Sequence, residues 1–473
     1  MLRSLARERP LRLKSLPRYG QWSSPCIFVL AVIGSAMGLG NIWKFPYLVG
    51  QYGGGAFVLA YLACVAAVGL PLMVAELMLG RRARSTPIYG LLRIAREEGL
   101  SGGWSVIGWL GSVTGLLVLS AYSIVGGWSM AYVFRSAAGA FHELDAVAAA
   151  RLFQELTDDP ERLLAWHTLF MAMTILVVSR GVRYGLEEAV RWFVPVLLTI
   201  LGILVFYAHG QPSFDRAVDF LLRPDFARLD ASALLAALGH AFFSLSLGLG
   251  ALVIYGVYAP ERVSLLAVAP IVVLTDTLVG LLAGLAIFSV VFQAGLSVAA
   301  GPGLIFQTLP LAFGTTPGGH LMATLFFTML VLAVWTSAIS MLEPAVTYVM
   351  KRWRVERSLA ASLVGVLVWS FGLLSLLSFN LWSHLQPLGS WSRLGRGTFF
   401  DVLNFFITGL LLPLTGILTA VFVGWRMSAD SSRIELGGGW GYRLWLVLIR
   451  FATPVAVVLL FLQAMGLLGW EVL

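Results

Sequence analysis

The sequence GSAMGLGNIWKFP, residues 34–46, interrupts an apolar run that extends over about 25–49. A run of this length could cross a bilayer as a helix. However, it contains Gly34, Gly38 and Gly40, and each glycine costs roughly 1 kcal/mol relative to alanine inside a helix. Unwound backbone is tolerated at membrane depth only where it is buried in protein or lines a cavity. The stretch therefore predicts a helix that breaks within the membrane.

A break of this kind can bind ions. Freed carbonyl groups can coordinate a cation, and the exposed amides of the next half-helix can hold an anion. The alternative is a glycine face for close helix packing. Asn41 and Lys44 favour the ion-binding interpretation, because packing alone needs neither an amide nor a cation at these positions.

The composition indicates a polytopic helical membrane protein. The chain is 59% hydrophobic and 12% charged, with a mean hydropathy of +0.86, and a soluble globule of this size cannot bury that much apolar surface. Residues 1–22 are basic and lack the apolar core of a signal peptide, which predicts a cytoplasmic tail. The net charge of +8 fits cytoplasmic loops facing anionic lipid, so we expect no nucleic-acid partner.

The pattern of apolar runs predicts about eleven spans. Basic loops alternate with acidic or neutral ones, which places the protein in the cell (inner) membrane with the N-terminus inside and the C-terminus outside. We expect a short helix in the outer loop at 301–316. The spans are expected near 24–50, 57–79, 106–137, 164–179, 191–208, 232–257, 263–294, 318–349, 359–379, 400–425 and 442–468.

A second glycine-interrupted polar stretch, SLSLGLG at 244–250, lies in about the sixth span. An odd number of spans separates the two breaks, so matching elements of the two halves run in opposite directions. Interrupted helices in matching places of inverted halves mark a transporter binding site. We therefore predict an all-α fold with inverted five-helix repeats at 23–209 and 232–425 and an eleventh helix at 440–473, although no residue-level repeat is detectable.

Two carboxylates fall inside predicted spans. Asp276 and Glu343 would each cost about 2.5–3.5 kcal/mol at the centre of a helix on insertion scales, so each is a candidate functional residue. The alternatives are a position near a span end or a carboxylate satisfied by a backbone amide. Pro344 follows Glu343, and the helix adjustment there could need such an acceptor.

The side chains at membrane depth are oxygen-rich, as hard monovalent cations require. Asn41, Ser244 and Asp276 form one candidate cluster, and Thr336 with Ser337 forms another. A Thr-Ser pair is usually satisfied by its own helix, and His240 alone is more typical of a core histidine than of a proton carrier. No transition-metal spacing, phosphate loop or nucleophile motif is present, so we expect no enzyme. Cys26 and Cys64 are interpreted as core residues.

The chain resembles the neurotransmitter:sodium symporter family, whose members have the leucine-transporter fold. The resemblance covers nearly the whole chain from Trp22 to the last span and is closest to bacterial eleven-span amino-acid transporters. The motifs that carry it are residues 34–46, GGGAF at 53–57, PLM at 71–73, Glu76, Gly80-Arg81, AFFSLSLG at 241–248 and Trp335-Thr336-Ser337.

The resemblance implies two sodium sites and a substrate whose carboxylate completes the first of them. Tyr122 matches the tyrosine that binds the substrate carboxylate, and Gly38 stands where amine transporters carry an acid, which leaves room for an amino acid. The implied first site comprises the Ala36 carbonyl, Asn41, Ser244 and Asp276, and the second comprises the Gly34, Met37 and Ala333 carbonyls with Thr336 and Ser337. The implied substrate site comprises Ala36, Gly38, Leu39, Gly40, Val118, Tyr122, Phe243, Ser244, Ser246, Leu249, Ser337, Ser340 and Met341.

The resemblance also implies two gates. Lys44 and Asp401 occupy the positions of an outer arginine–aspartate pair, with Phe243 as the lid below it. On the inner side, Trp22 and Tyr258 match gate residues. Lys351 stands where the acidic partner is expected, and Arg18 is one residue out of register.

Asp276 departs from the family, in which many members have asparagine at this position and chloride-dependent members add a nearby serine. Here Gly280 stands at the serine position and His240 at a glutamine position. A fixed carboxylate can balance sodium as chloride would, which predicts chloride-independent symport. The implied pocket lining is mostly apolar, so we expect a neutral, hydrophobic or aromatic L-amino acid as the substrate. Asp276 could instead take a proton when the site empties. A proton-coupled carrier and a non-transporting amino-acid receptor or sensor are the alternatives. Nothing in the sequence indicates an oligomer.

Overall fold

The computed structural model describes residues 20–142, 144–298, 303–389 and 397–468, which form helices joined by short connections. Most of the predicted cytoplasmic tail, including Arg18, lies outside the described residues. Within them, nine helical segments are long and apolar enough to cross a membrane, and a bent pair brings the number to ten. The nine are Gly55–Ala83 (α3, η2 and α4), Gly102–Ala137 (η3 and α6), Pro160–Ser179 (α8), Val182–His209 (η4 and α9), Leu265–Gln293 (α13), Gly319–Trp353 (α15), Arg357–Leu377 (α16), Phe399–Arg426 (α17 to η8) and Trp440–Ala464 (α20 to α21).

The bent pair is the predicted first break. Helix α1, Pro25–Ala36, begins after Ser24, whose side chain accepts a hydrogen bond from the Ile27 N–H, a standard N-terminal cap. After Ala36 the chain turns by 50° before the second half, Gly40–Gln51, which comprises η1 and α2. The helix expected to break at its glycines therefore does break there.

The predicted second break separates α11, Ala231–Ser244, from α12, Ala251–Val257. We call residues 245–250 the α11–α12 link. Ser246, Gly248 and Gly250 in this link have φ angles of 55°, 74° and 71°, which lie in the left-handed region that ends helices. Each half alone is too short to count as a span. The pair nevertheless corresponds to the sixth of the predicted spans.

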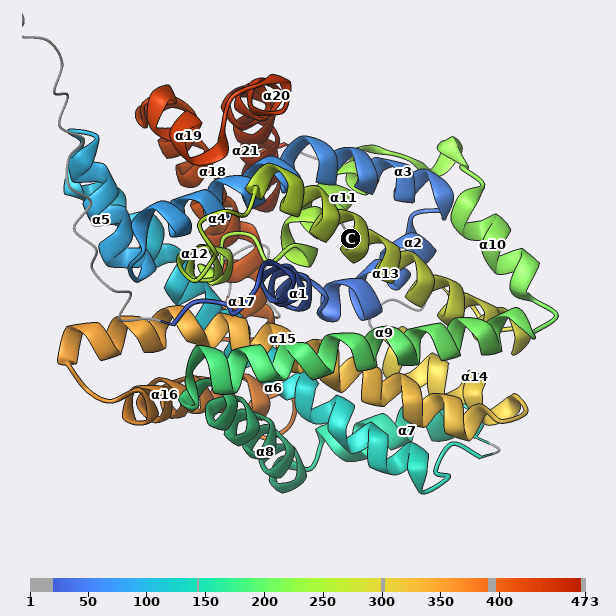
Figure 1. Cartoon of the computed structure of the whole chain (residues 1–473). Coiled ribbons are helices and arrows are strands. Elements are labelled where there is room, and N and C mark those ends of the chain that lie inside the picture. The colour runs from blue at the N-terminus through green and yellow to red at the C-terminus, as the bar shows by residue number, and fades with distance from the viewer. Residues whose placement is uncertain (1–19, 143, 299–302, 390–396, 469–473) are drawn as a thin grey trace, which may run out of the picture.

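Helix α1 lies in the middle of the bundle, where it contacts α9, α12, α13 and α15 (Figure 1). The two long helices α6 and α15 pack against each other beside it. This arrangement places both breaks inside the protein, as unwound backbone requires. The remaining helices are α5 (Pro87–Glu97), α7 (Ala146–Thr157), α10 (Phe214–Leu222), α14 (Leu309–Thr315, the short outer-loop helix, preceded by η6) and α19 (Ala429–Leu436).

Candidate functional site

A small cavity lies where the two broken helices face α6 and α15. Its free space is about 20 Å³, which is room for roughly one water molecule. All of its lining residues belong to the predicted substrate site, whereas Leu39, Ser244 and Ser340 lie outside the lining. The lining residues are Ala36, Gly38, Gly40, Val118, Tyr122, Phe243, Ser246, Leu249, Ser337 and Met341.

The Tyr122 hydroxyl is held against the first break. It accepts a hydrogen bond of 2.9 Å from the Leu39 backbone N–H. A Cβ atom at Gly38 would lie 2.3 Å from this hydroxyl and 2.7 Å from the Ser337 Oγ. Glycine at 38 is therefore needed for the approach of the tyrosine, and Leu39 contributes its backbone rather than its side chain.

A serine network joins the two breaks to α15. The hydroxyls of Ser246 and Ser337 donate to the Ser35 carbonyl at 2.7 and 3.1 Å. The Ser35 hydroxyl in turn donates to Ser340 at 2.9 Å, so Ser340 supports the cavity from behind. Sequence reasoning missed Ser35, because one serine in an apolar helix gives no sign of the helix it will meet.

The three side chains of the first candidate cation site meet between η1 (Gly40–Lys44), α11 and α13. The Asn41 amide donates to both the backbone carbonyl and the carboxylate of Asp276, each at 2.7 Å. The Asn41 Oδ1 atom is buried and has no hydrogen-bond partner among the described residues. The Tyr61 hydroxyl lies 3.1 Å from the Ser244 Oγ and donates to Asp276 at 3.3 Å. Tyr61 was not predicted, since a phenol within an apolar span carries no pairing signal.

The residues expected to form a second cation site converge between α1 and α15. A Cβ atom at Gly34 would lie 3.6 Å from the Thr336 Cβ, so the two helices approach closely there. The Thr336 hydroxyl donates to the Ala333 carbonyl at 3.0 Å, and α1 ends at Ala36, with Met37 as its C-cap. The Thr336 hydroxyl and the Ala333 carbonyl therefore lie together where α15 approaches Gly34, and both are oxygen donors of the kind that a hard cation prefers.

The expected outer pair is not formed in the structure. Lys44 lies with its Nζ atom 5.0 Å from the ring centre of Phe243, and no ion pair joins it to Asp401 among the described residues. The Asp401 carboxylate instead accepts hydrogen bonds from the Thr398 N–H and hydroxyl, both at 2.8 Å, and caps α17. The predicted roles of both residues as gates remain predictions.

The end of the bundle predicted to face the cytoplasm is held by a network in which Glu343 supplies the acid. The Trp22 N–H donates to the Tyr258 carbonyl at 3.2 Å, so the two predicted gate residues do meet. The Tyr258 hydroxyl donates to Glu343, which also forms an ion pair with Arg357. Lys351 donates to the Ser85 hydroxyl instead, at 2.7 Å. Arg357 was missed because it follows α15 in sequence as one of several basic residues.

Comparison with known proteins gives consistent matches over nearly the whole chain. The model of the "Sodium:neurotransmitter symporter family" matches residues 19–144 and 140–467. A sodium-dependent transporter of Bacillus subtilis, YhdH, is 35% identical and spans 95% of this chain and 98% of its own. One from Haemophilus influenzae is 29% identical, with coverage of 93% and 97%.

Among solved structures, MhsT in complex with L-phenylalanine superposes with a TM-score of 0.84 at 36% identity, covering 94% of this chain and 99% of MhsT. This match confirms the predicted fold class, a helical membrane protein of the leucine-transporter fold with a broken first span. The repeat boundaries at 23–209, 232–425 and 440–473 stay predictions.

Proposed function

Because this chain belongs to the sodium:neurotransmitter symporter family and is a sodium-dependent multi-pass membrane transporter, we propose that it carries a neutral, hydrophobic or aromatic L-amino acid into the cell. Sodium moving down its gradient drives uptake by alternating access. The observation that carries the proposal is the cavity between the two breaks, whose lining contains no charged side chain.

The lining suits a zwitterion with an apolar side chain. Val118, Phe243, Leu249 and Met341 supply apolar surface, and the Tyr122 hydroxyl supplies a donor for a carboxylate. With glycine at position 38, this site has no acidic side chain there to pair with the amine of a substrate, so we expect a substrate that brings its own carboxylate. MhsT, which has the same fold, was solved with L-phenylalanine, and this supports an aromatic substrate here.

The donor sets support two sodium sites. The unpartnered Asn41 Oδ1, with Asp276, Ser244 and the Ala36 carbonyl, fits one sodium ion whose shell a substrate carboxylate would complete. The carbonyls of Gly34, Met37 and Ala333 with the hydroxyls of Thr336 and Ser337 fit the other. Because the substrate carboxylate helps to coordinate the sodium ion, the movement of sodium is coupled to the movement of the substrate.

We also propose that uptake is independent of chloride. The fixed charge of Asp276 receives hydrogen bonds from Asn41 and Tyr61, as a bound anion would. Replacing chloride by gluconate should leave sodium-driven uptake unchanged, and a clear loss of uptake would contradict this part of the proposal.

Flux into proteoliposomes tests the function. A sodium gradient should drive accumulation of labelled L-phenylalanine, a potassium gradient should not, and phenethylamine should compete poorly because it lacks the carboxylate. Binding of phenylalanine without sodium-dependent flux would favour the receptor interpretation. Flux that follows a proton gradient in the absence of sodium would favour a proton-coupled carrier.

A further inference from the structure

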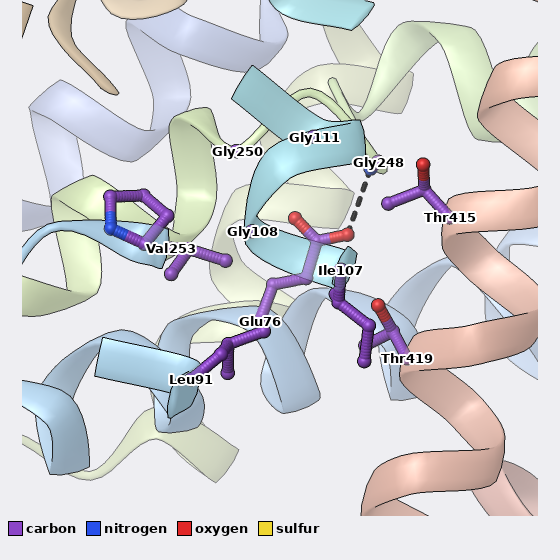
Figure 2. A pocket seen from close by; sticks show the side chains of 11 residues that line it. Glu76, Leu91, Ile107, Gly108, Gly111, Gly248, Gly250, Val253, Thr415 and Thr419 are labelled. Carbon is purple, nitrogen blue, oxygen red and sulfur yellow. Dashed lines mark hydrogen bonds between the residues drawn. The ribbon is translucent and has the colours of Figure 1, made fainter. Parts of the chain in front are cut away.

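Glu76, in the middle of α4, lies in a second cavity that no predicted site residue lines. The side chain is 2% exposed, and the free space beside it is about 10 Å³, close to the volume that a single water needs. Figure 2 shows the carboxyl group surrounded by α5, α6, α12, α18 and the α11–α12 link. The other lining residues, none of which is titratable, are Pro87, Leu91, Ile107, Gly108, Gly111, Gly248, Gly250, Val253, Thr415 and Thr419.

Only one of the two carboxyl oxygens of Glu76 is paired. Oε1 accepts a hydrogen bond of 2.8 Å from the Gly248 N–H (Figure 2). Oε2 is buried and has no partner among the described residues, and the Thr419 hydroxyl on α18 is likewise buried without one. An oxygen of a carboxylate and a hydroxyl therefore share a small cavity with nothing else in it that can neutralise a charge.

Glu343 provides the contrast within the same molecule. It is also fully buried, with 0% exposure, but it forms an ion pair with Arg357 and accepts a hydrogen bond from the Tyr258 hydroxyl. Among the described residues, no ion pair joins a cation to Glu76. Arg96, Asp430 and Arg433 are exposed. The other charged groups on elements packed against α4 have partners elsewhere: Arg81 with Glu435, Arg82 with Glu98, Arg93 with Glu97, Asp276 with Asn41 and Arg450 with the Gly424 carbonyl. Two tyrosines on these elements make ring contacts, Tyr89 with Tyr348 and Tyr255 with Trp22, and the buried Tyr255 hydroxyl has no partner among the described residues.

We propose that Glu76 is a proton-binding site, neutral in this conformation, whose proton is coupled to the position of the α11–α12 link. A buried carboxylate without a cation is neutralised rather than left charged. In the neutral form Oε1 still accepts from Gly248, and the new O–H bond on Oε2 has the Thr419 hydroxyl or one water in the cavity as its acceptor. The proton is taken from bulk water and returned to it.

The link carries the coupling because its two sides face two cavities. Ser246 and Leu249 line the cavity beside Tyr122, whereas Gly248 and Gly250 line the cavity of Glu76. A movement of the link that admits water to Oε2 would release the proton and also alter the first cavity. By linkage, a ligand that fixes the link in the first cavity must favour the protonated form of Glu76. This proposal does not depend on the identity of the transported solute.

Infrared spectroscopy of the full-length transporter in lipid nanodiscs with sodium tests the proposal. The difference spectrum between wild type and Glu76→Gln should contain the C=O stretch of a neutral carboxylic acid, shifted in D₂O. The matched control is Glu343→Gln, whose difference spectrum should contain the bands of an ionised carboxylate. Carboxylate bands in the Glu76→Gln difference spectrum would overturn the proposal.

A second variant keeps the test decisive if Glu76→Gln does not fold. Thr419→Val removes the hydroxyl that shares the cavity and changes little else. It should shift the frequency of the neutral-acid band, because the hydroxyl that accepts the Glu76 proton, or that holds the water accepting it, is lost. A neutral-acid band at an unchanged frequency in Thr419→Val would overturn the assignment to Glu76.

Discussion

The two helix breaks use glycine for different physical reasons. In the first, Gly34, Gly38 and Gly40 are absent from the residues with positive φ, and Gly38 is needed because Tyr122 and Ser337 lie against it. In the second, Gly248 and Gly250 have left-handed backbone, which is costly for other residues. The first break is thus fixed by contacts with other helices and the second by its own backbone.

The largest effect is expected from Gly38→Asp in the first break. The new Cβ atom would lie 2.3 Å from the Tyr122 hydroxyl, and a buried carboxylate costs a further 2.5–3.5 kcal/mol or so, so sodium-dependent phenylalanine uptake should fall by at least about 100-fold. Gly38→Ala introduces the steric clash without the charge, so its loss of uptake should be smaller than that of Gly38→Asp. Normal uptake by Gly38→Asp would show that Tyr122 does not depend on space at residue 38.

The next effect is expected from Gly248→Ala in the second break. Its φ of 74° imposes a backbone cost of roughly 1–2 kcal/mol on alanine, which should lower the thermal unfolding midpoint in detergent. Trimming the side chain that lies against each glycine tests whether the break is fixed by space or by its backbone. Leu412→Ala should not rescue Gly248→Ala, whereas Tyr122→Phe should partly restore the midpoint of Gly38→Ala. Rescue of both variants would mean that both breaks are fixed by space.

A smaller effect is expected at Ser246, whose φ is 55°. Ser246→Gly relieves roughly 1 kcal/mol of backbone strain but loses the hydrogen bond to the Ser35 carbonyl, worth about 0.5–1.5 kcal/mol, so the two terms nearly cancel. Ser246→Ala loses the bond and keeps the strain. The unfolding midpoint should therefore be higher for Ser246→Gly than for Ser246→Ala, and the reverse order would contradict a strained link.

The smallest effect is expected from the caps of the two broken helices. Asp230 caps α11, and hydrogen bonds from the Ala233 N–H and Ser232 lower the pKa of its carboxyl. Ser24 caps α1 and cannot titrate. A carboxyl whose pKa is lower in the folded protein stabilises the fold at pH values above its unfolded pKa of about 3.9. This contribution is lost as the pH falls through the pKa of the folded protein.

Acidification below about pH 5 should therefore destabilise wild type through Asp230 by about 0.3 kcal/mol or less, since the group is exposed. The measurement is the unfolding midpoint as a function of pH. Asp230→Asn keeps a capping side chain and should lack this component. An identical pH profile in Asp230→Asn would exclude a contribution from the cap.

Both breaks and the residues around the first cavity were predictable because they depend on local composition and on motif order. The density of glycines indicated where α1 and α11 end, and the family resemblance indicated which residues would lie around the cavity. The pairs between distant helices were not predictable. Nothing in the sequence near Tyr61 indicates Asp276, and nothing near Glu343 selects Arg357 among the basic residues that follow. Lys44 was expected to meet Asp401, but Thr398 satisfies that carboxylate locally and the lysine lies over the ring of Phe243.

The ion pair between Glu343 and Arg357 has a kinetic consequence. Glu343 and Arg357 lie on the consecutive helices α15 and α16. Tyr258, just after α12, reaches Glu343, and the Val178 carbonyl of α8 accepts a hydrogen bond from Arg357. Separating α12 from α15 therefore breaks one charge-assisted hydrogen bond, about 1.5–3 kcal/mol, while both charges stay neutralised. The activation barrier to this separation is thus free of the cost of parting two opposite charges, and high salt should change its rate little.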